Sequence, residues 1–475
     1  MTKTLTPDIC VIGAGSGGLS VAAAAAAFGV SVVLVERGKM GGDCLNYGCV
    51  PSKALIASAR QAQAMRSGQP FGIGAAEPEI DFAAVHRHLR DTIAAIAPND
   101  SAERFTALGV QVVKAEGRFK DRSTLMAGDM EICARRFVIA TGSSPLIPPI
   151  PGLDAVDYLT NETIFDLTEM PEHLLVIGAG PFGLEMAQAY RRLGAQVTVV
   201  EAGEALAKED KELSAVVLAR LRSEGVEIRE HTRIAAVERR GRHGVRLRLQ
   251  PDARPRILEG THLLLATGRT ANVAELRLDN AGVRHDAYGI KTNARLRSSN
   301  RRIYAVGDAA GSLQFTHAAN YHAGLVVRSI LFRLPASERR DIIPRVTFTD
   351  PEIAHVGMSE AEAARAYRAI RILRWPYSEN DRAHAEHRTD GHIKLVTSGR
   401  GRLLGVSIVG LHAGEMINFW ALALARKMTA RDIASYVAPY PTISEIGKRA
   451  AVAYFIPTTR NALVRRVVGL LRMLG

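Results

Sequence analysis

Two cysteines stand close together near the amino terminus, in a segment whose residue types suit redox chemistry. Residues 41–53 read Gly-Gly-Asp-Cys-Leu-Asn-Tyr-Gly-Cys-Val-Pro-Ser-Lys, which places Cys44 and Cys49 five positions apart. On a regular helix, Cα atoms at this spacing are roughly 8–9 Å apart, whereas a disulfide needs less than about 7 Å. A bond between them requires a distorted helix start, which Gly48 permits. A disulfide under such strain is typical of a redox switch; the alternative is a pair of buried free thiols.

The elements that would position these cysteines include a pattern that occurs twice. Residues 8–36 and 174–201 each contain an apolar strand, a glycine turn, a helix and a second apolar strand that ends in an acid. Each predicts a parallel βαβ unit with a G-x-G-x-x-G turn, in which the helix N-terminus faces the phosphates of a dinucleotide. Two copies about 165 residues apart therefore predict two dinucleotide sites. The glycines are Gly13, Gly15 and Gly18 in the first copy and Gly178, Gly180 and Gly183 in the second.

An acid closes the second strand of each unit. Glu36 and Glu201 occupy these positions, where a carboxylate accepts hydrogen bonds from ribose hydroxyls and repels a 2′-phosphate. Glu201 therefore favours NADH over NADPH at the second site. Arg191 and Arg192 on the preceding helix would weaken this preference if they reached the phosphate.

The length of the chain and its changes in sequence pattern indicate about three domains. A proline-rich stretch at 145–151 marks a linker before the second unit, and alternating strand and helix patterns after about residue 345 predict an α+β domain. We therefore expect a first dinucleotide-binding domain, a second one, a C-terminal α+β domain and a short basic helix. Their expected bounds are 1–150 with 271–344, then 151–270, then 345–457, and finally 458–475.

Composition narrows the function classes. The chain has 61 Lys and Arg against 48 Asp and Glu, a net charge of +13, which favours anionic partners or membrane surfaces. No basic patch interleaved with aromatics is present, which argues against nucleic-acid binding. Four cysteines are too sparse for a secreted disulfide framework. No signal peptide is visible, and the alanine run at 22–27 is too short to span a bilayer, so we expect a cytoplasmic protein.

The motifs together resemble the class I pyridine nucleotide–disulfide oxidoreductases, over nearly the whole chain from Asp8 to about Ala450. The resemblance is carried by the cysteine motif and by three further segments, Ala140-Thr-Gly142, Ala266-Thr-Gly268 and Tyr304-Ala-Val-Gly-Asp308. It implies two Rossmann-like domains, for FAD and for NAD(P)H, followed by a C-terminal α+β dimerisation domain. It also implies a homodimer in which each active site borrows residues from the partner.

The resemblance assigns roles to matching positions. Cys49 would touch the flavin and Cys44 would meet the substrate, while Lys53 would sit beside the flavin and pair with Glu185. Asp308 would lie near the ribityl-phosphate region of FAD. The remaining positions implied for FAD are Gly13, Gly15, Gly18, Glu36, Gly42, Thr141 and Gly142, and those implied for the nicotinamide nucleotide are Gly178, Gly180, Gly183, Glu201 and Gly268.

The C-terminal motif departs from the family pattern. Members that reduce small disulfides usually have a histidine there that exchanges protons with the outer thiol, whereas this chain reads Ala-Pro-Tyr-Pro-Thr-Ile-Ser-Glu over 438–445. Glu445 is retained, but Tyr440, with a pKa near 10, is a poor proton exchanger at neutral pH. A tyrosine at this position is similar to mercuric reductases, yet no cysteine follows Cys133 to deliver a soft metal ion. Tyr440 is therefore a hydrogen-bond donor or a packed aromatic.

Two smaller features leave their roles open. Pro181 occupies a position where the family often places a side chain that gates the nicotinamide. Four histidines could replace the missing acid–base group or bind metal, but no spacing selects any of them, and we predict no metal site. They are His317, His384, His387 and His392.

The C-terminal tail, residues 460–475, is amphipathic and has no acid. Arg465 and Arg472 lie opposite its apolar face and Arg466 lies at the border. It is either an interfacial membrane helix or a terminal helix packed on the dimer. The apolar face comprises Leu463, Val464, Val467, Val468, Leu470, Leu471 and Leu474.

The sequence thus predicts a homodimeric FAD enzyme that passes electrons from NADH through the flavin to Cys44 and Cys49. The final acceptor would be a disulfide, a soft metal ion or another small oxidant, and the reverse oxidation of a dithiol is also open. One alternative is a diaphorase-like reductase that passes electrons from flavin directly to quinones. Another is a membrane-associated redox sensor or scaffold without turnover.

Overall fold

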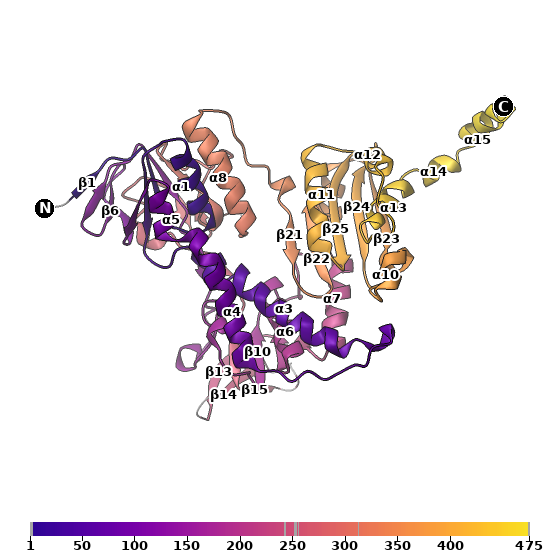
Figure 1. Ribbon diagram of the computed structural model, residues 1–475, viewed down its shortest axis with the longest axis horizontal. Coiled ribbons are helices and arrows are strands. Elements are labelled where there is room, and N and C mark those ends of the chain that lie inside the picture. Colours follow the sequence, from indigo (N-terminus) through magenta and orange to yellow (C-terminus); the bar gives the residue numbers. More distant parts are fainter. Residues whose placement is uncertain (1–2, 242–243, 251–253, 255, 312, 474–475) are drawn as a thin grey trace. The chain divides into compact units, whose positions relative to one another are not determined.

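The computed structural model describes residues 3–241, 244–250, 254, 256–311 and 313–473, and shows a mixed α/β chain (Figure 1). The chain divides into two compact units. The first comprises Met1–Gly203 and Glu227–Glu338, and the second comprises Glu204–Val226 and Arg339–Gly475. The predicted domain boundaries at 150, 270 and 344 stay predictions.

The first βαβ unit builds a five-stranded parallel sheet in the first compact unit. Its strands are β2 (Ile9–Ile12), β3 (Val32–Glu36), β4 (Val110–Lys114), β8 (Arg136–Ile139) and β20 (Ile303–Ala305), in the order β20-β8-β2-β3-β4. Helix α1 (Ser16–Ala27) connects β2 to β3, and its small residues let α8 (Thr316–Leu331) pack against it. The continuous apolar strands are buried on both faces, as a covered parallel sheet requires.

The second βαβ unit forms a four-stranded parallel sheet. Its strands are β10 (His173–Ile177), β11 (Gln196–Val200), β12 (Glu227–Arg229) and β16 (His262–Leu265), in the order β12-β11-β10-β16. Helix α6 (Pro181–Leu193) connects β10 to β11 and packs against α3 (Cys49–Arg66). The helix that carries Cys49 therefore lies against the helix that follows the second glycine loop.

Smaller sheets and helices complete the first unit. One mixed sheet has the order β1-β7-β6-β5, an antiparallel sheet has the order β13-β14-β15, and two strand pairs join β9 to β17 and β18 to β19. These strands are β1 (Lys3–Leu5), β5 (Gly117–Phe119), β6 (Leu125–Ala127), β7 (Met130–Ile132), β9 (Ser143–Pro145), β13 (Ile234–Arg240), β14 (Gly244–Leu249), β15 (Ile257–Gly260), β17 (Arg269–Ala271), β18 (His285–Asp286) and β19 (Gly289–Ile290). The remaining helices are α2 (Gly42–Asn46), α4 (Phe82–Ile96) and α5 (Ala102–Ala107).

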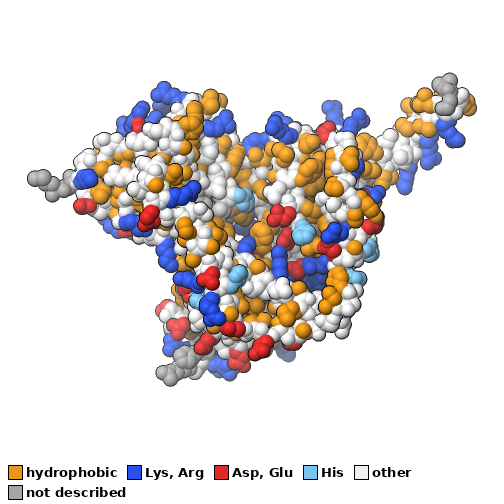
Figure 2. Space-filling view, in the orientation of Figure 1, with side chains coloured by type: hydrophobic (Ala, Val, Ile, Leu, Met, Phe, Trp, Pro, Cys, Tyr) orange, Lys and Arg blue, Asp and Glu red, His pale blue; other side chains and the backbone are white. Residues whose placement is uncertain are grey.

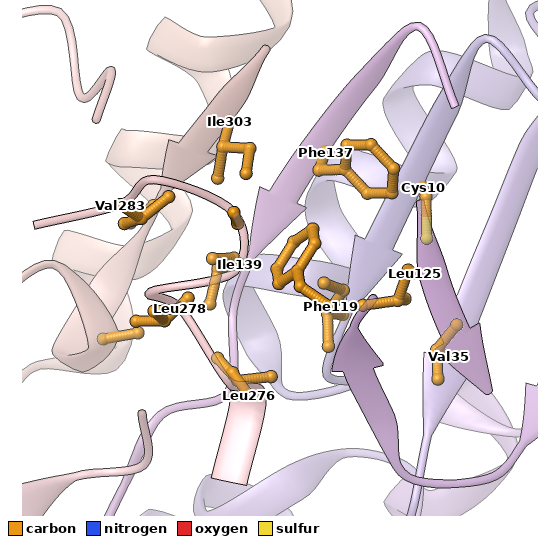
Figure 3. Packing of buried hydrophobic residues seen from close by; sticks show 14 of the residues in the cluster. Cys10, Val35, Phe119, Leu125, Phe137, Ile139, Leu276, Leu278, Val283 and Ile303 are labelled. Carbon is orange, nitrogen blue, oxygen red and sulfur yellow. The ribbon is translucent and has the colours of Figure 1, made fainter. Parts of the chain in front are cut away.

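One hydrophobic core lies between the five-stranded sheet and the β5-β6-β7 strands (Figure 3). Phe119 and Phe137 meet edge to face in this core with ring centroids 5.3 Å apart, an arrangement that adds to the free energy gained by burying the rings. Cys10 is completely buried beside them, and burial raises the pKa of its thiol. Cys10 is thus a packed, unreactive thiol.

The second unit is an antiparallel sheet covered by helices, which confirms the predicted α+β domain. Its strands are β21 (Arg345–Thr347), β22 (Glu352–Gly357), β23 (Ile370–Pro376), β24 (His392–Ser398) and β25 (Leu403–Gly410), in the order β21-β22-β25-β24-β23. Its helices include α9 (Glu360–Ala366), α10 (Asp381–Ala385), α11 (Ala413–Ala425), α12 (Ala430–Ser435) and α13 (Glu445–Ala453).

A buried lysine ties α7 (Lys211–Ser223) to this sheet. Lys394 on β24 is only 3% exposed, and its Nζ lies 2.7 Å from Asp210, 3.1 Å from Glu212 and 2.7 Å from Glu360. Because a buried ammonium is costly unless it is paired, these carboxylates fix α7 on the sheet. Residues 204–226, which the sequence places in the second dinucleotide domain, pack with the C-terminal unit for this reason.

The chain ends in two short helices, α14 (Ile456–Thr459) and α15 (Ala462–Leu471). They extend away from the C-terminal sheet, and α15 has no buried residue (Figure 1). Leu474, which the sequence assigns to the apolar face of the tail, lies outside the described residues. Among the described residues, no helix is both long enough and apolar enough to cross a bilayer.

Candidate active site around Cys44 and Cys49

The two cysteines lie on two different helices. Cys44 is in α2, which ends at Asn46, and Cys49 begins α3. Gly48 interrupts the helix with φ −125° and ψ −109°, and a Cβ there would lie 2.8 Å from an oxygen of Asp43. The structure therefore has the helix interruption that the cysteine spacing requires. The structure has Cys44 and Cys49 as neighbouring cysteines that are not joined to each other.

The environment makes the two thiols unequal. The hydrogen bond from Cys44, helped by one from Thr316 and by the charge of Lys53, lowers the pKa of Cys49 to about 6. The same bond between the thiols, together with burial, raises the pKa of Cys44. The Cys49 sulfur lies 3.3 Å from the Thr316 hydroxyl at the start of α8. The lowered pKa favours the thiolate form of Cys49, and the raised pKa favours the neutral thiol form of Cys44.

The cation near the thiols is held by a buried acid. Lys53, one turn after Cys49 on α3, places its Nζ 2.9 Å from Oε2 of Glu185 on α6. Glu185 is 5% exposed and Lys53 is 38% exposed. The pairing of these two residues, expected from the resemblance, is present in the structure. The ion pair holds the positive charge of Lys53 where it acts on Cys49.

Each glycine loop is shaped so that no side chain fits in its turn. Gly13 and Gly178 have φ of +103° and +106°, and a Cβ would lie 2.4 Å and 2.5 Å from the carbonyl oxygens of Ala140 and Ala266. Later in each loop, a Cβ at Gly18 would lie 1.9 Å from the Gly13 carbonyl oxygen, and a Cβ at Gly183 would lie 2.1 Å from the Gly178 carbonyl oxygen. Strand, turn and helix therefore approach as closely as they do because these positions are glycine.

The segment before Cys44 lies against the first loop. Gly41 pairs with Gly15 as a β-bridge, and the Gly41 amide donates to the Ala14 carbonyl at 2.9 Å. Gly42 has φ +60°, and a Cβ there would lie 2.7 Å from the Gly15 Cα. This contact brings the cysteine segment to the N-terminus of α1.

The two acids at the strand ends are held in the same way. In the first unit, Glu36 accepts hydrogen bonds from the amides of Ala14 at 2.6 Å and Gly38 at 2.5 Å. In the second unit, Glu201 accepts from Ala179 and Gly203, each at 2.9 Å. Each carboxylate is thereby oriented beside its glycine loop, with lone pairs left for ribose hydroxyls.

The residues present fit a dinucleotide at each loop. Gly15 and Gly180 are the N-caps of α1 and α6, and neither helix has a side-chain cap or an acid in its first turn. No other residue has an atom within 4 Å of where a Cβ at Gly180 would be, so the space beside this turn is open. Such helix N-termini favour phosphate through their amides and dipole.

A polar network missed by the sequence analysis joins Asp308 to Asp43. The Ser143 hydroxyl donates to Asp308 at 2.5 Å, and Arg269 donates to Ser143 while its Nη2 lies 3.0 Å from Asp43. Burial raises the pKa of Asp308, and the Ser143 hydrogen bond and the charge of Arg269 oppose that rise. At the Asp43 end of this network, the side-chain amide of Asn161 donates a hydrogen bond to Asp43 at 2.9 Å. Arg269 directly follows the Ala-Thr-Gly268 motif, which was the one available signal.

A buried histidine holds the turn before Asp308. The Gly307 amide donates to Nδ1 of His322 at 3.2 Å, so Nδ1 is unprotonated and Nε2 carries the hydrogen. Nε2 lies 2.9 Å from Glu338, and His322 is completely buried. His322 and Glu338 thus position the Asp308 segment, although neither belongs to a motif in the sequence.

The two Ala-Thr-Gly segments meet through strands β9 and β17. Thr141 donates its hydroxyl to the Asn272 carbonyl at 2.7 Å, and the Asn272 amide donates to the Gly142 carbonyl at 2.9 Å. The Gly268 carbonyl accepts from Leu146 at 2.9 Å. Both glycines have positive φ, +66° for Gly142 and +118° for Gly268. The two segments therefore form the crossing between the dinucleotide-binding sheets.

Tyr440 and Glu445 lie in the second unit, so the structure does not place them against the cysteines. Tyr440 is 69% exposed and donates its hydroxyl to Asp381 at 2.8 Å, a bond that raises the pKa of the phenol. Glu445 begins α13 and pairs with Arg449 at 2.9 Å. Tyr440 is thus a hydrogen-bond donor, one of the two roles expected for it.

The remaining candidates show ordinary surroundings. His384 lies 2.8 Å from the Ser378 carbonyl, His317 stacks on Phe315, and burial lowers the pKa of His392. Among the described residues, no group of three or more His, Cys, Asp and Glu side chains gathers around a possible metal position. Pro181 is exposed at the first turn of α6.

Comparison with known proteins agrees with this geometry. The family model described as pyridine nucleotide-disulphide oxidoreductase matches residues 7–323, and that of the family's dimerisation domain matches residues 343–451. The chain belongs to the pyridine nucleotide-disulphide oxidoreductase family. It is an FAD-dependent oxidoreductase that uses a nicotinamide nucleotide, which confirms the resemblance and the fold expected from the sequence.

Similar proteins cover nearly the whole chain. The chain is 36% identical to a mercuric reductase of Streptomyces lividans, over 94% of this chain and 96% of that protein. It is 34% identical to dihydrolipoyl dehydrogenase 3 of Pseudomonas aeruginosa, over 94% of this chain and 97% of that protein.

Among solved structures, LpdA of Mycobacterium tuberculosis has a TM-score of 0.86 at 27% identity over 95% of this chain and 99% of that one. The Cu(II) complex of the HOCl-induced flavoprotein disulfide reductase RclA from Escherichia coli has a TM-score of 0.83 at 25% identity, over 93% and 98%. These relatives support a disulfide reductase over a diaphorase or a scaffold.

Proposed function

We propose that Cys44 and Cys49 are the redox pair of this enzyme, and that NADH is the electron donor for reduction of a small disulfide or a soft metal ion. The observation that carries the proposal is the position of Cys49, whose sulfur lies 3.3 Å from the Thr316 hydroxyl, beside Cys44 and one helical turn before the paired Lys53. A dithiol with one stabilised thiolate is the arrangement that thiol–disulfide exchange requires.

The net reaction with a disulfide acceptor converts NADH, one proton and the disulfide into NAD⁺ and two thiols. When bound, FAD supplies the hydride acceptor and passes two electrons to a cysteine disulfide. Cys44 then attacks one sulfur of the substrate and releases one thiol, and Cys49 attacks Cys44 to release the second and restore the Cys44–Cys49 bond. Lys53 stabilises the Cys49 thiolate, and Thr316 donates a hydrogen bond to it.

The two classes of acceptor, disulfides and soft metal ions, differ in how they depend on removal of the proton from the Cys44 thiol. The pKa of Cys44 is raised, and Tyr440, whose own pKa is raised by its bond to Asp381, does not accept a proton at neutral pH. Exchange with a disulfide therefore lacks the usual acid–base partner. Soft metal ions bind thiolates directly and displace the proton themselves, so they are less affected by this loss. The mercuric reductases and the Cu(II) complex among the similar proteins support including soft metals.

Glu201 supports NADH as the nucleotide. Its carboxylate is fixed beside the second loop by the amides of Ala179 and Gly203. A 2′-phosphate would meet this negative charge, whereas ribose hydroxyls would donate to it. Arg192 is only 5% exposed, so it is not available to offset the charge at the surface.

The dimerisation domain supports a homodimer, in which the partner's copies of Tyr440 and Glu445 would complete each active site. The first dinucleotide domain (1–150 and 271–344) would bind FAD and the second (151–270) would bind NADH. The crossing of β9 and β17 near residues 145 and 270 supports these limits.

The test is an acceptor screen with purified, FAD-loaded protein. Lipoamide, glutathione disulfide, Hg(II), Cu(II) and a quinone are offered with NADH to the wild-type chain, to Cys44→Ser and to the control Cys133→Ser. The proposal expects Cys44→Ser to lose turnover with the disulfide or metal acceptor while Cys133→Ser keeps it. Undiminished turnover of Cys44→Ser with the best acceptor would contradict the proposal and favour direct reduction by the flavin.

A further inference from the structure

The C-terminal helix α15 is formed without burying any of its side chains. The Asn461 side chain caps it by accepting from the amides of Leu463 and Val464, and Arg465 donates to the Thr459 carbonyl at 2.8 Å. Yet Leu463 is 69% exposed and Leu470 is 64% exposed. Large apolar side chains exposed together on one element indicate an interaction surface.

The side chains of α15 are sorted around its axis. At about 100° per residue, Leu463, Val467 and Leu470 fall close together, and Val464, Val468 and Leu471 widen this side to less than half of the circumference. Arg466 falls at one border of this side, and Arg465 and Arg472 fall together opposite it. Figure 2 shows blue and orange side chains together on this projecting helix. An arginine at the border of an apolar face can extend toward a charged surface while the face is buried, and arginines on the opposite side stay in water near the headgroups.

The charge around α15 has one sign only. The last acidic residue of the chain is Glu445, and the tail, residues 460–475, carries four arginines, at positions 460, 465, 466 and 472. The chain as a whole carries +13, so the surface of a second copy repels this helix on average. Anionic phospholipid headgroups attract it, and acyl chains accept its apolar side. The helix also lies beyond the family's dimerisation domain, whose match ends at residue 451.

We propose that α15 binds the surface of anionic phospholipid membranes. It lies in the plane of the interface, with Leu463, Val467 and Leu470 in the acyl boundary and the arginines at the phosphates. A helix of ten residues is about 15 Å long, too short to span the hydrocarbon core of about 30 Å, so the contact is peripheral. One such helix binds weakly, and two copies in a homodimer would strengthen binding through avidity. This proposal does not depend on the identity of the acceptor.

The experiment is co-sedimentation of the FAD-loaded full chain with vesicles of phosphatidylcholine alone and with vesicles containing phosphatidylglycerol, at about 0.1 M salt. The wild-type chain is expected to sediment only with the anionic vesicles and to be released as salt rises. Arg465→Gln with Arg466→Gln removes two charges and weakens binding by roughly 30-fold, at about fivefold per arginine. Leu463→Asp with Leu470→Asp removes the apolar contact and abolishes binding.

A matched control carries the same charge change elsewhere. Arg301→Gln with Arg302→Gln alters two exposed arginines of the first unit and leaves vesicle binding unchanged. All variants keep solution turnover with NADH. Equal binding of the wild type to both kinds of vesicle, or unaltered binding of the tail variants, would overturn the proposal. Loss of the dimer in the leucine variant, with vesicle binding of the arginine variant intact, would show that α15 packs on a second copy and would also overturn it.

Discussion

Lys53 and Glu185 are 132 positions apart in the sequence, yet Nζ of the one lies 2.9 Å from Oε2 of the other. The pair joins α3, which begins at Cys49, to α6, which begins at the second glycine loop. The pair therefore ties the helix that carries Cys49 to the helix that follows the second glycine loop. Because Glu185 is 5% exposed, its carboxylate depends on the lysine for compensation of its charge.

Replacement of Lys53 by Met is expected to leave Glu185 as a buried charge with its main cation removed. The free energy of unfolding should fall by roughly 1–3 kcal/mol, below the usual loss for a fully buried pair because Lys53 is 38% exposed. The double variant Lys53→Met with Glu185→Leu should recover most of this stability. Turnover should stay low in both variants, because the charge beside Cys49 is absent in both. Recovery of turnover together with stability would show that the pair is only structural.

The alkylation rate of Cys49 is expected to follow a pKa of about 6. A lowered pKa means that the thiolate persists above pH 6, so reaction of the dithiothreitol-reduced protein with iodoacetamide should rise through pH 6 and level off near neutral pH. Thr316→Val removes one stabilising hydrogen bond and should move this midpoint upward, while Thr316→Ser should keep it. Peptide mass spectrometry assigns the alkylated cysteine. A midpoint near the ordinary thiol pKa in the wild type would contradict the assigned environment.

Two glycines of the second loop should respond differently to alanine. At Gly183 the new Cβ would lie 2.1 Å from the Gly178 carbonyl oxygen, so the backbone must move and the chain should lose about 1–3 kcal/mol. At Gly180 no atom lies within 4 Å of the new Cβ, and stability should change by less than about 0.5 kcal/mol. Gly180→Ala should instead raise KM for NADH, because its methyl group approaches the expected pyrophosphate position. An unchanged KM would remove the second loop from the NADH site.

Glu201→Gln should lower kcat/KM for NADH by roughly 10- to 100-fold, the range for loss of a hydrogen bond to a charged group. The activity with NADPH should fall less or rise, because the repulsion of a 2′-phosphate is removed. The ratio of the two values is the measurement. Glu204→Gln, which alters an exposed acid nearby in sequence, is the control. A wild-type preference for NADPH would contradict the role given to Glu201.

The C-terminal unit should lose stability in acid through Glu212. The hydrogen bond from Arg374, followed by that from Lys394, lowers the pKa of Glu212 to about 2. Because the folded pKa lies below the unfolded value, the stabilisation is complete above about pH 4.5 and is lost as the pH falls toward 2. Both tryptophans, Trp375 and Trp420, lie in this unit, so their fluorescence reports its urea midpoint. The difference in midpoint between wild type and Glu212→Gln should shrink between pH 5 and pH 3; a constant difference would contradict the pairing.

The parts of this protein that could be predicted from its sequence are those fixed by local constraints. The glycine loops, the acids at the strand ends and the interrupted helix at Gly48 each follow from steric or hydrogen-bonding requirements within a few dozen residues. These constraints also give the α/β class and the C-terminal α+β unit, since strand and helix patterns there are regular.

The residues that could not be predicted act across long distances in the sequence. Arg269 reaches Asp43, and His322 holds Gly307 while pairing with Glu338. No local pattern encodes these contacts, because each depends on how β17, α8 and the following loop are brought together. The docking of α7 on the C-terminal sheet was missed for the same reason, since it depends on the buried Lys394.

The central claim, that electrons from NADH reach the Cys44–Cys49 pair, is tested most directly by counting thiols. Air-oxidised, FAD-loaded protein is mixed anaerobically with one equivalent of NADH, quenched with iodoacetamide and digested. The mass of the peptide that contains residues 41–53 is then measured by mass spectrometry. We expect Cys44 and Cys49 both to become alkylated as the NADH is consumed, and neither to be alkylated without NADH. Consumption of the NADH while the two cysteines stay joined as a disulfide would contradict electron transfer to this pair.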